Sequence, residues 1–219
     1  MFGKEKKKIF ISCCSNRNPE WATVLSIEDA MRDAAKHGFD TVFPPQMGDS
    51  LIDRARNNDL VSFMQKGADY LFSIDDDVSI APDTLTTLAK ADKDIVAGIY
   101  RLKQDNPVAA VRLPVDGPSW NDVLVHGLLT PAIYVSTGCF MVKRKVVEGM
   151  IEKYPELHYK RNVSGDKAWA LYMPFIYNQE YLSEDWGYCQ RARDAGFEVW
   201  VHGGVKCAHW GKKMFVFGD

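Results

Sequence analysis

The segment YLFSIDDDV, residues 70–78, joins an apolar run to three consecutive acidic residues. The apolar run has the length and composition of a buried strand, so Asp75, Asp76 and Asp77 would stand at its carboxyl end. Alternate residues of an extended chain point the same way, which places the carboxylates of Asp75 and Asp77 together. Paired carboxylates suit Mg²⁺ or Mn²⁺. The segment therefore predicts a divalent-metal site or, in the plainer interpretation, a solvated acidic turn in which Asp77 or Asp83 caps a helix.

Strand and helix patterns alternate on both sides of this segment. Continuous apolar runs predict buried strands, and apolar residues at helical spacing predict helices. We expect strands at 8–14, 41–43, 70–74, 94–100, 108–113, 139–142, 197–201 and 205–208, and helices at 21–37, 50–65, 82–91, 146–154 and 183–193. Gly38, Gly67 and Gly196 are expected to end helices, and Ser183 to cap the last one. The alternation, which becomes mixed later in the chain, indicates an α/β fold with a mixed, mainly parallel central sheet.

The bulk composition is that of one globular domain. The chain has 219 residues, of which 46% are hydrophobic and 26% charged. We expect a single domain over 1–219, with a basic lead-in at 1–7 and an aromatic, loop-like region at 158–182 that covers substrate. The net charge of -2 provides no electrostatic argument for nucleic-acid binding.

The cysteines and the apolar runs bear on the cellular compartment. There are 5 cysteines, an odd number without a CxxC pair, which argues against a disulfide framework or a structural zinc site. No apolar run approaches the roughly 20 residues of a membrane span, and the N-terminal lysines precede no signal-peptide core. We therefore expect a cytoplasmic protein, in a cell or a phage-infected host, without a membrane span.

Further polar groups follow other strands that end at the same edge of the expected sheet, where α/β proteins bind ligands. They are the loop at 15–18, the acidic pair Glu184 and Asp185 that opens a helix, and His209. Two carboxylates and an imidazole favour Mn²⁺ over Mg²⁺. The acidic pair and His209 also have plainer interpretations. The acidic pair complements the helix dipole, and His209 could be an interior histidine beside Trp210.

The second helix carries Arg54 and Arg56, which lie two residues apart and cannot share a helix face. At most one of them can point into the cleft at the sheet edge. An arginine in that position would balance diphosphate charge with its planar guanidinium fork.

In this order, the segments resemble the GT-A nucleotide-sugar glycosyltransferases, in particular family-2-like members that include short bacterial and phage forms. The matching segments are IFISCCSNR (9–17), ARN followed by LV (55–61), YLFSIDDDV (70–78), TGCFMVKR (137–144), SEDWGYCQRARDAG (183–196) and HWG (209–211). Together they span residues 9 to 211. The ordered set is specific, although each segment alone is weak. The first loop departs from the family's pattern, which leaves the recognised nucleotide open.

The resemblance implies a reaction and a role for each motif. A sugar would pass from a UDP- or GDP-sugar to an acceptor hydroxyl on a glycan, a small molecule or a modified nucleic acid. Asp185 would be the general base, supported by Glu184. The implied metal ligands for Mn²⁺ (or Mg²⁺) are Asp75, Asp77 and His209, and the implied donor-binding residues are Ser15, Arg17, Arg56, Asn57, Asp75, Asp76 and Gly138.

Two other functions compete with this interpretation. A nucleotidyltransferase-like enzyme on a similar sheet would usually show a glycine-rich phosphate loop, and residues 12–17 contain no glycine. A non-catalytic module of the same fold could bind a sugar or a partner through the aromatic residues between Trp169 and Tyr181. The intact acidic triplet, acidic pair and histidine favour an enzyme.

Overall fold

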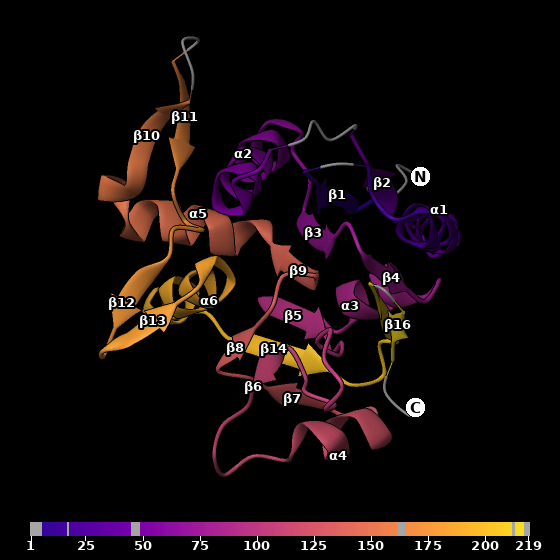
Figure 1. Ribbon diagram of the computed structural model, residues 1–219. Coiled ribbons are helices and arrows are strands. Elements are labelled where there is room, and N and C mark those ends of the chain that lie inside the picture. Colours follow the sequence, from indigo (N-terminus) through magenta and orange to yellow (C-terminus); the bar gives the residue numbers. More distant parts are fainter. Residues whose placement is uncertain (1–5, 17, 45–48, 162–164, 212, 217–219) are drawn as a thin grey trace.

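A seven-stranded sheet forms the centre of the molecule (Figure 1). The computed structural model describes residues 6–16, 18–44, 49–161, 165–211 and 213–216. The sheet has the order β2-β1-β3-β9-β5-β14-β7. Its strands are β1 (Lys8–Cys14), β2 (Asp40–Val42), β3 (Tyr70–Asp75), β5 (Ile95–Gly98), β7 (Leu129–Pro131), β9 (Cys139–Lys143) and β14 (Val199–His202).

The sheet is mixed, and most of its strands run in one direction. β1 pairs in parallel with β2 and β3, and β5 pairs in parallel with β14. β9 is antiparallel to both β3 and β5, so these two strands point the same way, and β7 is antiparallel to β14. The expected α/β fold with a mixed, mainly parallel sheet is confirmed.

Helices cover both faces of the sheet, which explains why its strands lack a polar face. The helices are α1 (Trp21–Lys36), α2 (Ile52–Gln65), α3 (Thr84–Lys90), α4 (Trp120–Val125), α5 (Arg144–Lys153) and α6 (Glu184–Asp194). Ile9 and Ile11 of β1 pack in one core cluster with residues of α1 and α3. Phe10 packs on the opposite face with residues of α2, α5 and α6. Gly38, Gly67 and Gly196 follow helices with positive φ, as expected.

Two hairpins replace the loop expected at 158–182. One is formed by β10 (His158–Arg161) and β11 (Asp166–Trp169), and the other by β12 (Phe175–Tyr177) and β13 (Glu180–Leu182). The second hairpin turns through Asn178 and Gln179, whose φ angles are 47° and 67°. Two consecutive residues with left-handed backbone make a tight hairpin turn, for which Asn-Gly is the usual sequence signal. Because the second residue here is glutamine, the sequence does not predict this turn.

A small three-stranded sheet beside α3 carries the last part of the chain (Figure 1). It contains β4 (Val78–Ile80), β15 (Cys207–Trp210) and β16 (Met214–Phe215). β4 was not expected, because it is three residues long and follows the acidic triplet directly. It pairs with β15 in a register that sets His209 opposite Val78. This pairing brings the histidine to the carboxyl end of β3.

The remaining short elements lie outside the central sheet. The strand expected at 108–113 is reduced to β6 (Val111–Arg112), which pairs with β8 (Tyr134–Val135). A 3₁₀ turn, η1, covers Pro155–Leu157. Every helix among the described residues is too short or too polar to span a bilayer.

Candidate active site

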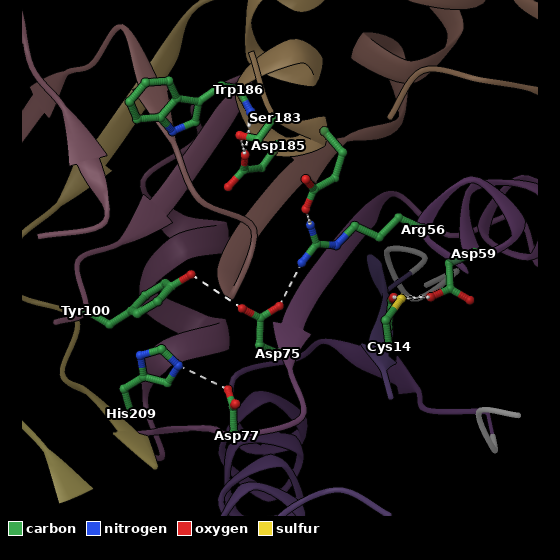
Figure 2. A network of polar contacts seen from close by, with 12 residues as sticks. Cys14, Arg56, Asp59, Asp75, Asp77, Tyr100, Ser183, Asp185, Trp186 and His209 are labelled. Carbon is green, nitrogen blue, oxygen red and sulfur yellow. Dashed lines mark hydrogen bonds and ion pairs between the residues drawn. The ribbon is translucent and has the colours of Figure 1, made fainter. Parts of the chain in front are cut away.

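Polar side chains from distant parts of the chain gather where β3 ends (Figure 2). Asp75 is the last residue of β3, and Asp76 and Asp77 form the turn into β4. α2 contributes Arg56, the start of α6 contributes Glu184 and Asp185, and β15 contributes His209. The loop after β1 contributes Ser15. Each aspartate of the triplet has its own set of partners.

Asp75 belongs to a buried ion-pair network. The Nη2 atom of Arg56 donates to its Oδ1 at 2.7 Å, and the Nη1 atom donates to Oε1 of Glu184 at 2.5 Å. The Arg56 side chain is only 6% exposed. The hydroxyl of Tyr100 donates to Oδ2 of Asp75 at 3.5 Å. Burial and the Asp75 carboxylate raise the pKa of Tyr100, so its hydroxyl stays protonated and remains a donor.

Asp77 lies between an imidazole and an ammonium group. Its Oδ1 is 3.1 Å from Nε2 of His209, and its Oδ2 accepts a hydrogen bond from Nζ of Lys103. Burial alone would raise the pKa of Asp77, but the contacts with His209 and Lys103 outweigh burial and lower it. The backbone carbonyl of Asp77 accepts from the amide of Trp210 at 2.7 Å, which ties the triplet to β15.

Asp76 faces the loop after β1. Its Oδ2 accepts a hydrogen bond from the hydroxyl of Ser15, and its carbonyl accepts from the amide of Glu20 at 2.8 Å. Burial raises the pKa of Asp76, and repulsion by Asp75 and Asp77 raises it further, against the lowering effect of Ser15. The pKa values of the adjacent Asp76 and Asp77 are therefore shifted in opposite directions.

The two acidic residues at the start of α6 have different surroundings. Burial raises the pKa of Glu184, with Arg56 acting in the opposite direction. Asp185 accepts hydrogen bonds at Oδ1 from the hydroxyl of Ser183 and from the amide of Trp186 at 2.8 Å. No described residue donates to its Oδ2. Ser183 does occupy the expected N-cap position, but its hydroxyl donates to Asp185 and makes no cap bond to the helix backbone.

Gly138 is required by the close packing around Asp75. A Cβ atom at this position would lie 2.4 Å from the hydroxyl oxygen of Tyr100 and 2.6 Å from Oδ2 of Asp75. Asn57 is buried, and its Oδ1 accepts from the amide of Tyr172 at 3.0 Å, which makes it a link between α2 and the segment before β12. Arg17, expected to bind the donor, lies outside the described residues.

Three residues of the site and its surroundings escaped the sequence analysis. Tyr100 ends the strand expected at 94–100, and nothing in the surrounding sequence indicates that its hydroxyl belongs to the site. Lys103 lies in a loop whose path is set by tertiary contacts. Asp59 is buried on α2 and accepts hydrogen bonds from Ser12 and Cys14. Its place one helical turn after Arg56 was the available signal, since a charge on a buried helix face calls for partners.

The arrangement of Asp77 and His209 fits a divalent cation. Nδ1 of His209 lies 2.9 Å from the carbonyl oxygen of Arg101, which can only accept, so this nitrogen carries a proton. Nε2 then faces Oδ1 of Asp77, and a proton or a cation must separate their lone pairs. One carboxylate and one imidazole match the chemistry of Mn²⁺. The described residues contain no cluster of three or more metal-ligating side chains, since Asp75 points to Arg56 and Tyr100.

Comparisons with known proteins bear on the fold. No family model matches the chain, and no curated protein matches its sequence. The chain is similar in structure to protein A197 from STIV, with 15% sequence identity, coverage of 98% of this chain and 95% of that chain, and a TM-score of 0.54. This likeness shows a shared fold.

Two further solved structures are similar at lower scores. The mannose-1-phosphate geranyltransferase from Thermus thermophilus has 13% identity, coverage of 93% of this chain and 76% of that chain, and a TM-score of 0.46. Residues 1–349 of S. aureus TarS, in complex with UDP-GlcNAc, have 8% identity, coverage of 91% and 56%, and a TM-score of 0.46. The central sheet and the likeness to A197 confirm the expected α/β, GT-A-like fold class, and membership of a family-2-like group stays a prediction.

Proposed function

We propose that this protein is a glycosyltransferase that moves a sugar from a nucleoside-diphosphate sugar to an acceptor hydroxyl. One observation carries the proposal. The acidic triplet, Arg56, the acidic pair of α6 and His209 come from separate parts of the chain and meet at the carboxyl end of β3. Ligands of open α/β sheets bind at this edge.

The Asp77 side of the site suits the departing diphosphate. Asp77 and His209 would hold Mn²⁺ (or Mg²⁺), and the bound ion would supply positive charge to the diphosphate as the bond to the sugar breaks. Asp76, in the turn into β4, accepts a hydrogen bond from Ser15 on the loop after β1. The ribose or the donor sugar would sit beside this pair. Asp75 is engaged with Arg56, so its part is to fix the arginine and the end of β3.

Asp185 is the best-placed general base. Its Oδ1 is held by Ser183 and by the amide of Trp186, which sets the direction of the carboxylate. Its Oδ2 is left to accept the proton of an acceptor hydroxyl. Glu184 is less suited, because its carboxylate is engaged by Arg56.

The proposal is tested by donor turnover without any acceptor other than water. The protein is incubated with a panel of UDP-, GDP- and ADP-sugars, with Mn²⁺ or with EDTA, and release of the nucleoside diphosphate is measured. We expect turnover of at least one donor with Mn²⁺ and none with EDTA. Neither binding nor turnover of any donor would overturn the proposal, and binding without turnover would favour a non-catalytic sugar-binding module.

Substitution of the proposed base separates donor binding from chemistry. Asp185→Asn should bind the donor as tightly as the unmodified protein and lower turnover by about 100-fold or more, because general bases contribute about 10²–10⁴-fold. Asp194→Asn is a matched control at the other end of α6, where the carboxylate accepts from Gln190. Full turnover by the Asp185→Asn protein would place the base elsewhere or indicate retention of configuration.

A further inference from the structure

Lys103 lies on a loop that is bound to the last described strand of the chain. β5 ends at Gly98, and the chain beyond it folds back on itself, with Arg101 bridged to Ala109 and the amide of Leu102 donating to the carbonyl of Val108 at 2.9 Å. Arg101 is buried, and its guanidinium donates to the carbonyls of Asp105 at 2.7 Å and of Val216 at 3.1 Å. The backbone at Lys103 is therefore held by contacts on both sides.

The side chain of Lys103 reaches the acidic triplet across Gly211. A Cβ atom at Gly211 would lie 3.2 Å from Cδ of Lys103, so a larger residue there would crowd the lysine stem. The ammonium donates to Oδ2 of Asp77, and the side chain is 34% exposed. Lysine has a flexible stem and a compact charge, so its ammonium can move between neighbouring anions while the backbone stays in place.

The two permanent cations of the described site differ in availability. Arg56 is 6% exposed and bound on both sides by Asp75 and Glu184, so moving it would leave two carboxylates without a counter-charge. Among the residues that the structure describes, Lys103 has one anionic partner, Asp77, and its side chain has contact with solvent. A diphosphate that approaches this acidic strand end needs positive charge, and Lys103 is the cation that can be released to it.

The same contact affects the metal site. The ammonium on Oδ2 of Asp77 places a positive charge within a few ångströms of any ion held by Oδ1 of Asp77 and Nε2 of His209. Like charges at that separation repel appreciably even when solvent partly screens them. Without a diphosphate, Lys103 and the divalent cation compete for one carboxylate. With a diphosphate, both cations have anionic oxygens to bind.

We propose that Lys103 is a diphosphate-binding residue. Without nucleotide its ammonium pairs with Asp77 and opposes metal binding, and when a nucleoside diphosphate binds, the ammonium moves to the diphosphate. The inference rests on the proposed function. In this inference, Lys103 is a second cation that binds the leaving diphosphate. The divalent ion then binds tightly only when the diphosphate is also bound.

The test measures binding rather than turnover. Mn²⁺ binding is followed by electron paramagnetic resonance, first without nucleotide and then with UDP, GDP or ADP, for the unmodified protein and for Lys103→Met, Lys103→Arg and Lys213→Ala. Lys213→Ala is the matched control, because Lys213 lies on the same part of the molecule and pairs with the exposed Asp105 at 3.5 Å.

We expect opposite changes in the two arms. Without nucleotide, Lys103→Met should bind Mn²⁺ about threefold or more tightly than the unmodified protein, because the competing charge is gone. With Mn²⁺ present, the same protein should bind the preferred nucleoside diphosphate about tenfold more weakly, the usual loss for a hydrogen bond between charged groups. Lys103→Arg should keep most of both properties, and Lys213→Ala should match the unmodified protein.

The outcomes separate this inference from the proposed function. Unchanged or weaker Mn²⁺ binding by Lys103→Met overturns the competition, and unchanged nucleotide affinity overturns the diphosphate role, while the proposed function stands in both cases. If the unmodified protein binds no nucleoside diphosphate, the proposed function and the diphosphate role fail together. The arm without nucleotide still decides the competition on Asp77.

Discussion

The two ends of the acidic triplet are alike in sequence and opposite in environment. Asp75 is tied to the buried Arg56, which also holds Glu184, so its charge is neutralised within the fold. Asp77 contacts the imidazole of His209 and the ammonium of Lys103, which reach it from another strand and from a loop. The difference teaches that two aspartates separated by one residue (a DXD pattern) are not by that spacing equivalent metal ligands. The helix and strands packed against each aspartate decide its role.

The largest effect is expected from breaking the Asp75 side. Arg56→Ala would leave Asp75 and Glu184 partly buried without a counter-charge, which should lower the free energy of unfolding by about 3–5 kcal/mol. Urea unfolding at neutral pH measures this. Arg54→Ala is the matched control on the same helix, because Arg54 is 56% exposed and pairs with Asp49 at the surface. Equal losses for the two variants would show that the buried network does not stabilise the fold.

Asp77→Asn should break the other side without unfolding the protein. We expect Mn²⁺-dependent affinity for the donor to fall by about 100-fold or more, since even supporting residues of a metal site contribute about 10–100-fold. Donor binding with and without Mn²⁺, measured by calorimetry, checks this. Asp75→Asn should instead act mainly on the free energy of unfolding. A larger loss of Mn²⁺ binding in Asp75→Asn than in Asp77→Asn would reverse the assignment.

Gly138→Ala should disturb the Asp75 side through packing alone. The added methyl group would meet the Tyr100 hydroxyl and the Asp75 carboxylate at distances that force a shift. Overpacking of this kind usually costs about 1–3 kcal/mol of unfolding free energy. Thermal or urea unfolding gives the value, with Gly117→Ala at an exposed position for comparison, where the added Cβ would lie 3.2 Å from the carbonyl oxygen of Pro114. A loss no greater than that of Gly117→Ala would mean that the close approach of Gly138 is not required.

The smallest effect concerns the pH dependence of stability. The pKa of Asp76 is raised above its ordinary value of 3.8, so the native state holds its proton more strongly than the unfolded chain. The stability from this group is present below 3.8 and is lost as pH rises through the raised pKa. The pKa of Asp77 is lowered, so its stability is present above 3.8 and is lost as pH falls through the lowered pKa.

In the unmodified protein, stability falls as the pH rises from 3.8 to the raised pKa of Asp76. Asp76→Asn should abolish this fall. The change should stay below about 1 kcal/mol, because solvent screens a half-exposed carboxylate. Urea unfolding from about pH 3 to about pH 6 resolves it. Asp77→Asn should flatten the curve at the acidic end instead. Identical pH profiles for the two variants would contradict the opposite shifts.

Local patterns were enough for most of the central sheet and its helices. β1 spans the expected 8–14, and α1, α2 and α6 lie within two residues of their expected bounds. Long apolar runs and glycine stops are local features, so no knowledge of neighbours is needed. β4 and the hairpin of β12 and β13 were missed because they are three residues long and depend on their partners.

The sequence by itself determined the composition of the site: an acidic triplet after a buried strand, an acidic pair at a helix start, an arginine on α2 and a histidine near the end of the described chain. Only the tertiary structure decided how these groups are paired. Arg56 pairs with Asp75 and Glu184 because α2 and α6 pack on the same face of the sheet. His209 reaches Asp77 through the register of β4 with β15, and Lys103 through a loop held by Arg101. Electrostatic pairing acts over a few ångströms, and residues 77, 103 and 209 are far apart in the sequence. Only folding of the chain brings them within that distance of one another.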